Sequence, residues 1–307
     1  MPTTIGTGTE QSAVTLNWLM QDPLRIPMQI RSFFRAQFVA DQILRRAGKA
    51  TGGAVQYWVS NPLTPDVTGG GVEVIAPLAE IPVANPIVGS PASEPAYVRG
   101  LGLRIGRTQI EREDIGSVLL GIQQIKNAMV ASVDGALMAK FAAAITQTVA
   151  VTTPWDASSG TTIRKDWMAA NRIVEDLRPS GFDYRLDTLL VNLNTRDDLM
   201  AAPEFAATFI GNAADQNYML NGALPTRLWN FNIIASPQVP ADIAYGLQSK
   251  IIGGIADERG TPDEPIEVSD MFLEPAYDMA QRWNITRAAA GFIDNPGAIV
   301  KFTNVET

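Results

Sequence analysis

The feature that most constrains the fold is a long helical periodicity between residues 115 and 148. Apolar residues recur there every three or four positions. They are Ile115, Val118 or Leu119, Ile122, Ile125, Met129, Val133, Leu137, Phe141 and Ile145. Asp114 or Ser117 can cap the start, and Pro154 follows the end. A helix over 115–148 would be about 50 Å long, so the rest of the chain must supply an extended layer for it to lie on.

The segments before this helix have a different character. Residues 1–30 lack a clear period and contain three prolines, which predicts an extended arm. The pattern over 31–47 predicts a short amphipathic helix that ends before Gly48. Residues 51–96 hold seven prolines and a triple glycine at 69–71, with strand-like runs at 55–59 and 72–75. We expect a long hairpin with its tip at 64–71, which must pack on something else because it has no core of its own. A strand over 97–112 then leads into the long helix.

The second half alternates between helical and strand patterns. A helix is expected over 163–177 and another after Asn194 or Thr195, with strands at 189–193, 229–235, 250–256, 278–290 and 297–303. Residues 257–265 form an acidic loop in this interpretation.

Composition excludes much chemistry. The 307 residues include no cysteine and no histidine, so there is no thiolate nucleophile, no imidazole base and no Cys or His metal ligand. Any enzyme here would have to work with carboxylates, Lys, Tyr, Ser or backbone groups alone. We find no sequence motif for a catalytic, cofactor or metal site, and the expectation is a protein that is not an enzyme and holds no cofactor and no metal. The net charge of −8 argues against a nucleic-acid reader or a binder of anionic membranes. No targeting segment is recognisable, and Asp134 and Lys140 interrupt the most apolar stretch, so we expect a soluble, intracellular protein.

Three local patterns have a functional and a structural interpretation. Gly100 to Gly106 superficially resembles a dinucleotide-binding loop, but the third glycine is one position late and the stretch lies within a strand, so close backbone packing is favoured. Asp197 and Asp198 fit the first turn of a helix, where its dipole favours them. The acids of the 257–265 loop fit a solvated surface. The alternative for both acidic groups is a catalytic carboxylate pair or a Ca²⁺ or Mg²⁺ site; its residues would be Asp197, Asp198, Asp257, Glu258, Asp263 and Glu264.

Charge is distributed in blocks of alternating sign. Residues 51–96 contain four acidic residues and no basic one, whereas the segments on both sides carry a basic excess. Such blocks suggest surfaces that meet, within one chain or between copies of it, although chance clustering in short windows explains them equally well. The candidates for inter-subunit contacts are Asp66, Glu73, Glu80, Glu94, Arg99, Arg104, Arg107, Arg45 and Arg46.

The order of these elements resembles the major capsid protein of tailed double-stranded DNA bacteriophages, the Hong Kong 97 fold. Three stretches carry the resemblance besides the order: NLNTRDDL at 192–199, LPTRLWNFNIIASPQVP at 224–240 and PGAIVKF at 296–302. It implies an α+β chain with an N-terminal arm and first helix (1–48), an extended β-hairpin loop (49–96), and a peripheral domain (97–160) with a spine helix at 115–148. An axial domain (161–268) and peripheral return strands (269–307) complete it.

The resemblance also implies a function and partners. Pentamers and hexamers of the chain would close into an icosahedral shell around phage DNA, in a virion assembled in the host cytoplasm. Partners would be other copies, a portal, a separate scaffolding protein and possible cement or decoration proteins, with non-specific contact to packaged DNA and no membrane. Some relatives cross-link a loop lysine to an asparagine. Residues 50–125 contain no lysine and 268–278 no asparagine, so we expect a non-covalent shell.

Two alternatives remain open at this stage. One is an encapsulin-like protein compartment, which the sequence hardly separates from a phage capsid. The other, from a different class, is a carboxylate-dependent α/β hydrolase.

Overall fold

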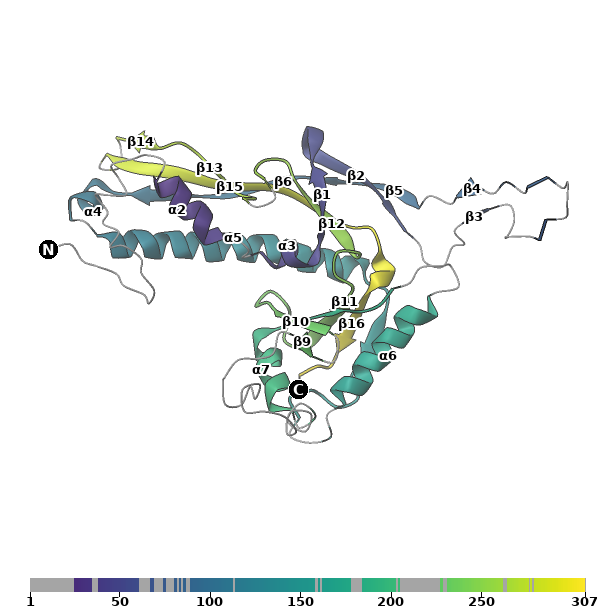
Figure 1. Cartoon of the computed structure of the whole chain (residues 1–307). Helices are drawn as coiled ribbons and strands as arrows, with labels where there is room; N and C mark the ends of the chain where they lie inside the picture. The colour runs from purple at the N-terminus through teal and green to yellow at the C-terminus, as the bar shows by residue number, and fades with distance from the viewer. Residues whose placement is uncertain are drawn as a thin grey trace.

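The computed structural model describes residues 25–34, 38–60, 67–68, 74–75, 80–81, 83, 85–86, 89–112, 114–157, 160, 162–177, 184–202, 204, 227–228, 231–261, 264–275, 277 and 279–306. Of the arm predicted over 1–30, residues 1–24 lie outside these residues, and residues 25–30 are helical instead of extended. Of the hairpin tip predicted at 64–71, residues 64–66 and 69–71 lie outside the described residues, and residues 67–68 form a short strand. Two six-stranded sheets and one very long helix make up most of the fold. Figure 1 shows an elongated layer of helix and strands above a second lobe that contains α6 and α7.

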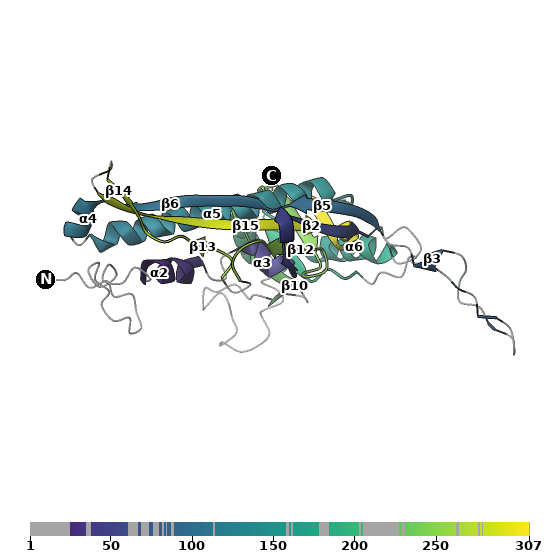
Figure 2. The same cartoon turned by 90° about the horizontal axis from the view of Figure 1, so that it is seen from above.

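The long helix α5 runs over Ile115–Ala144, with Asp114 capping it by accepting a hydrogen bond from the Ser117 amide at 3.2 Å. It is 30 residues long, or about 45 Å, and ends four residues before the expected boundary. Its buried positions follow the predicted period: Val118, Ile122, Met129, Val133, Leu137 and Phe141. They pack α5 along β6 (Tyr97–Ile105) and β15 (Ala280–Ile293), as Figure 2 shows from above.

The first sheet is built around β15. It has the order β1-β12-β15-β13, and both β14 and β6 also pair with β15. The flanking strands are β1 (Arg45–Lys49), β12 (Gly253–Asp257), β13 (Glu267–Val268) and β14 (Phe272–Glu274). β6 and β15 are antiparallel over nine residues, from Tyr97 opposite Ala289 to Ile105 opposite Gln281.

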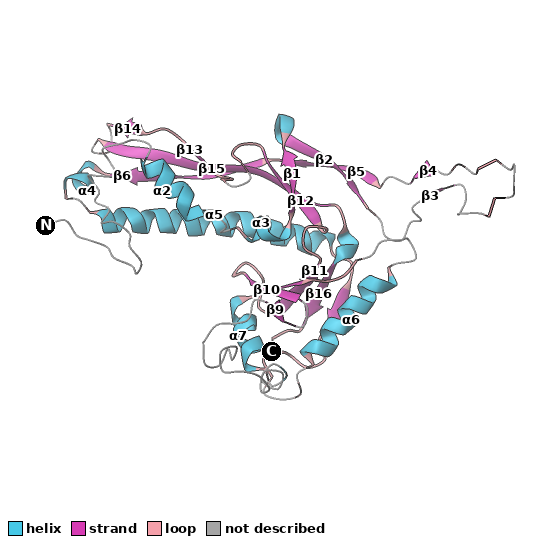
Figure 3. Cartoon of the chain, viewed as in Figure 1, coloured by secondary structure: helices cyan, strands magenta, loops and turns pink. Residues whose placement is uncertain are grey.

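The second sheet has the order β7-β16-β11-β8-β10-β9. Its strands are β7 (Thr148–Ala150), β8 (Thr188–Val191), β9 (Arg227–Leu228), β10 (Phe231–Ala235), β11 (Ile243–Leu247) and β16 (Ile299–Thr303). Helix α6 (Ile163–Asp176) covers it through Ile163, Trp167, Ala170 and Val174, and Trp167 packs on Phe231 and Phe302. Figure 3 separates these helices and strands by colour.

Two stretches that carry the resemblance meet in this sheet. Asn192 caps α7 (Leu193–Ala201), and its side-chain amide donates a hydrogen bond to the Val239 carbonyl. The strand before Asn192, β8, pairs in parallel with β10. The unit made of β8, the Asn192 cap and α7 is therefore held to the segment that ends near Pro240 by one side-chain hydrogen bond and one parallel strand pairing.

Near the N-terminus, the single helix expected over 31–47 is wrong. The structure has α2 (Arg25–Phe34) and α3 (Val39–Ile43), followed by the strand β1. Phe34, Phe38, Ile43 and Leu44 are buried as expected. Residues 45–49 are extended because β1 pairs in parallel with β12, a partner about 200 residues away in the sequence.

The extended loop is a hairpin, but its pairing differs from the prediction. β2 (Ala54–Val59) pairs with β5 (Ser90–Pro95) instead of 72–75, and beyond them β3 (Val67–Thr68) pairs with β4 (Asn85–Pro86). Residues 74 and 75 are not in a strand. The hairpin is therefore longer than expected, and Figure 1 shows β3 and β4 projecting beyond the body, on the side away from β14 and α4.

The strand expected over 97–112 ends at Ile105. Gly106 begins the short helix α4 (Arg107–Glu111), and the Gln109 side chain accepts a hydrogen bond from the Gly106 amide at 3.0 Å. Within β6, a Cβ on Gly100 would lie 2.8 Å from the Ile285 carbonyl oxygen. Close packing on β15 thus explains this glycine, as predicted.

Four of the described strands lie in other sheets than the expected domain boundaries imply. β12 and β13 fall within the segment 161–268 but pair with β15 in the first sheet. β7 falls within 97–160 and β16 within 269–307, but both lie in the second sheet, where β16 pairs with β7 and β11. The chain crosses between the two sheets after β6, after β11 and after β15, whereas the expected domains are consecutive segments.

Candidate assembly surfaces

A buried cluster of charges holds the N-terminal segment to the first sheet. The Arg287 side chain is fully buried, and its guanidinium binds the carboxylates of Asp41 at 2.7 Å and Asp257 at 3.0 Å. Arg46 binds the same two carboxylates at 3.3 and 2.7 Å. Burial lowers the pKa of Arg287, but the two carboxylates outweigh it and leave the pKa above its usual value. Asp257 and Arg46 therefore hold the subunit together and are not free surface groups.

Asp134 lies beside this cluster on α5. Its carboxylate accepts hydrogen bonds from the backbone amides of Val39 and Ala40, both at 3.2 Å, and so caps α3 from a distant part of the sequence. Burial raises the pKa of Asp134 to about 6, against the opposing effect of these hydrogen bonds and of Arg287. The charge of Asp41 adds to the increase.

Most of the predicted contact residues are paired within the chain. Arg45 binds Asp294, Arg46 binds Asp257, Glu94 binds Lys140, Arg104 binds Glu274 and Arg107 binds Glu111. Arg104 also lies over the Tyr277 ring, 4.1 Å from its centroid. Asp66 and Glu73 lie outside the described residues. These nine residues were predicted to make contacts between subunits. Five of them form ion pairs within their own subunit.

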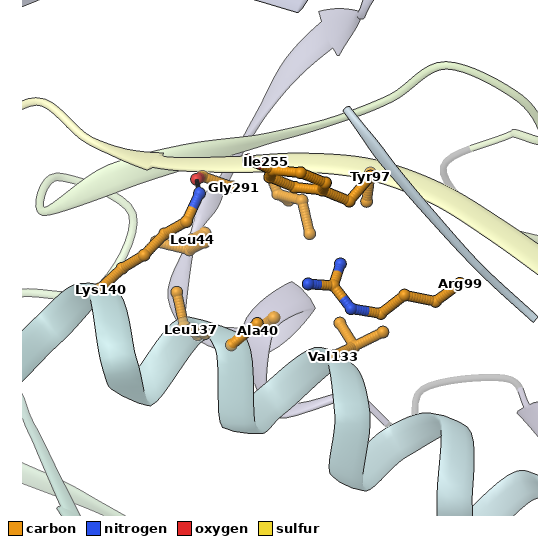
Figure 4. A pocket seen from close by; sticks show the side chains of 11 residues that line it. Ala40, Leu44, Tyr97, Arg99, Val133, Leu137, Lys140, Ile255 and Gly291 are labelled. Atoms are coloured by element: carbon orange, nitrogen blue, oxygen red, sulfur yellow. Dashed lines mark hydrogen bonds between the residues drawn. The ribbon is translucent and has the colours of Figure 1, made fainter. Parts of the chain in front are cut away.

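Arg99 and Glu80 are the exceptions. Among the described residues, no carboxylate pairs with Arg99, whose guanidinium lies 5.7 Å from the centroid of the Tyr97 ring. Figure 4 shows it directed into a small cavity between α5 and the sheet, about 60 Å³ in volume, beside Val133. Across the cavity, Lys140 donates a hydrogen bond to the Gly291 carbonyl. Glu80 is exposed and has no basic partner in the described part of the chain.

Large apolar side chains are exposed in three places that sequence reasoning missed. One is the end of the first sheet around β14, one is the hairpin strand β2 with Trp58, and one is the start of β6. The members are Met271, Phe272, Leu273, Tyr277 and Met279, then Trp58, then Tyr97, Val98 and Leu101. Large apolar side chains that are exposed close together on a surface are typical of sites of interaction with other proteins. The sequence gives no direct signal, because an apolar residue in a strand is normally assigned to the core.

The described residues contain no group of three or more acidic residues placed to hold a metal ion. Asp197 lies on the surface of α7 and binds Arg196, and Asp257 is tied up by Arg287. In the same part of the chain, no helix is both long and apolar enough to cross a membrane.

Comparison with known proteins shows which family this chain belongs to. The profile of the family described as phage capsid protein matches residues 94–302, about two thirds of the chain. The chain belongs to the phage capsid protein family. A search of curated proteins by sequence gives no match.

Solved structures give the same fold. The capsid of the cyanophage P-SCSP1u is 10% identical, with 88% of this chain and 89% of that chain covered and a TM-score of 0.60. A phage-related protein from Bordetella bronchiseptica RB50 is 10% identical over 96% and 99%, with a TM-score of 0.59. The capsid of a native GTA particle is 13% identical over 100% and 96%, with a TM-score of 0.56.

The Hong Kong 97-like fold and the structural role expected from the sequence are thereby confirmed. This capsid protein is a component of a shell formed by copies of itself. The hydrolase and encapsulin alternatives are not favoured.

Proposed function

We propose that this capsid protein forms rings of five and six copies that close into an icosahedral shell around double-stranded DNA in the virion. The observation that carries the proposal is the hairpin that begins with β2 and β5, because its outer strands β3 and β4 project beyond the body (Figure 1) and its β2 strand exposes Trp58. In a shell of identical subunits, the neighbouring copy supplies the surface that covers it.

The sheet of β15 and α5 would form the peripheral part of each subunit, and the sheet of β16 and α6 the axial part near the ring centre. A net charge of −8 supports a container rather than a binder of DNA, since each Lys or Arg on a phosphate would strengthen sequence-independent attraction. We propose no enzymatic role. The portal, a separate scaffolding protein and decoration proteins are the further partners expected of such a shell.

The shell would be held together without covalent cross-links, because residues 50–125 contain no lysine to form one. Complementary shape and apolar contacts would then hold neighbouring subunits together, and complementary charges would set the register between them.

Sedimentation of the purified protein tests the proposal. A shell protein pellets as megadalton particles that show closed shells in electron micrographs, whereas a chain that remains a monomer or small oligomer under all assembly conditions contradicts it. Extraction of the contents distinguishes the two kinds of container: packed nucleic acid supports a phage capsid, and protein cargo an encapsulin-like compartment.

A further inference from the structure

The cavity beside Arg99 is enclosed by three separate parts of the chain. Its apolar walls come from Ala40 and Leu44 of the N-terminal segment, from Val133 and Leu137 of α5, and from Ile255 of β12 (Figure 4). The volume is about 60 Å³. A single water molecule needs about 10–15 Å³ by this measure, so the cavity has room for a group of a few heavy atoms.

Arg99 brings a positive charge into these apolar surroundings. Its guanidinium is directed into the cavity (Figure 4). Arg99 lies on β6 directly opposite Arg287 of β15, so the two side chains share the face toward α5. Like charges opposite each other on neighbouring strands are destabilising. This position therefore favours a negative charge close to Arg99.

The cations beside Arg99 already have partners. Arg287 binds the carboxylates of Asp41 and Asp257 at 2.7 and 3.0 Å. Lys140, across the cavity, binds Glu94 at 2.5 Å. In the described part of the chain, Arg99 is thus the cation at this cavity that no carboxylate balances.

Asp134 does not balance Arg99, although it follows Val133 on α5. Its carboxylate is held by the backbone amides of Val39 and Ala40, both at 3.2 Å. Successive side chains on a helix point about 100° apart, and Asp134 lines a different cavity. The cavity beside Arg99 therefore combines apolar walls with one surplus positive charge.

We propose that this cavity binds a small monocarboxylate, such as acetate or propionate, with the carboxylate on Arg99 and the apolar end against Val133 and Ile255. The paired N–H donors of a guanidinium match the two oxygens of a carboxylate. One negative charge balances the one surplus positive charge. A dianion such as phosphate would exceed that charge and would meet apolar walls on its other sides.

A ligand in this position would join the N-terminal segment, α5 and the first sheet. Every contact lies within one subunit, so the site does not depend on the proposed shell. Because the cavity exists only in the folded chain, binding should raise the stability of the subunit by mass action.

Thermal unfolding of the full-length chain tests the proposal at pH 7 in acetate, propionate, phosphate or chloride of equal ionic strength. We expect a saturable increase in Tm with acetate and propionate. It should be half complete at roughly 1–10 mM, because a ligand of so few atoms can make only weak total contacts. Saturation-transfer NMR on the propionate protons gives a second readout that does not depend on unfolding.

Two variants remove the site in different ways. Arg99→Met removes the charge and keeps a long side chain, whereas Ala136→Leu keeps Arg99 and fills the cavity, which Ala136 also lines. The matched control is Arg172→Met, which removes an exposed arginine from α6. We expect both site variants to lose the increase in Tm and the NMR signal, and the control to keep them. If Ala136→Leu fails to fold, Arg99→Met and its control decide the result.

Three results would overturn the inference. An equal effect of acetate on the wild type and on Arg99→Met would show that the ion acts on the whole surface. Tighter binding of phosphate than of acetate would exclude a monocarboxylate site. If no carboxylate binds the subunit, but Arg99→Met lowers the yield of particles, the cavity instead takes an acidic side chain from another copy.

Discussion

Asp134 makes stability depend on pH in a direction opposite to that of most carboxylates. Its side chain is 1% exposed, and burial raises its pKa from 3.8 to about 6. The folded state therefore holds a proton more tightly than the unfolded state. This contribution to stability is fully present below pH 3.8 and is lost as the pH rises through 6.

The magnitude follows from the shift. About two pKa units at 1.36 kcal/mol each give roughly 3 kcal/mol between pH 4 and pH 7. Asp134→Asn cannot ionise and still offers an amide oxygen to the backbone amides of Val39 and Ala40. The free energy of unfolding of the wild type should therefore fall by about 3 kcal/mol relative to this variant across that range.

Urea unfolding of purified subunits at half-unit pH steps measures this difference, because all other titrating groups are common to both proteins. Asp134→Ala serves as the second comparison. It leaves two buried amides without an acceptor, at a cost of roughly 1–3 kcal/mol each, so it should destabilise α3 at every pH. A wild-type curve parallel to that of Asp134→Asn, or one that loses stability as the pH falls through 6, would refute the reasoning.

Three further outcomes are expected. A Cβ at Gly253 would lie 2.2 Å from the Phe292 carbonyl oxygen, so Gly253→Ala should lower the free energy of unfolding by about 1–3 kcal/mol. The control is Gly291→Ala, for which the nearest atom is 3.8 Å away and which should change little; equal effects would contradict the packing argument. Trp58→Ala should change subunit stability by less than about 0.5 kcal/mol because the ring is exposed, yet reduce particle yield, and unaltered assembly would speak against a covered hairpin. Shells boiled in detergent should run as monomers, and a ladder of multimers would show cross-links that the missing lysines should prevent.

The elements with strong local signals could be predicted from the sequence. The period from Val118 to Phe141 specified α5, and Ile163, Trp167 and Val174 specified α6, because a helix buries one face wherever it lies. The order of the elements was enough to indicate the fold. In contrast, residues 45–49 were expected in a helix and form β1, because pairing with β12 overrides local preference.

The contact residues were harder to predict for a physical reason. Blocks of charge in the sequence show where basic and acidic residues gather along the chain. They do not show whether Arg104 binds Glu274 of its own chain or an acidic residue of another copy, because that depends on how the strands pair in the fold. Asp134 was seen only as a charge that interrupts an apolar stretch. Its role as a cap requires knowing that α3 begins against α5, some 95 residues away in the sequence.

The position of β16 has a consequence for how the subunit is made. It lies between β7 and β11, inside the second sheet, yet its residues 299–303 follow those of every other described strand. During synthesis, the two sides of that sheet cannot be joined until these residues leave the ribosome. The first sheet in turn needs β12 and β15, which come shortly before. A nascent or truncated chain therefore lacks the completed second sheet, and we expect only subunits translated through β16 to enter a growing shell.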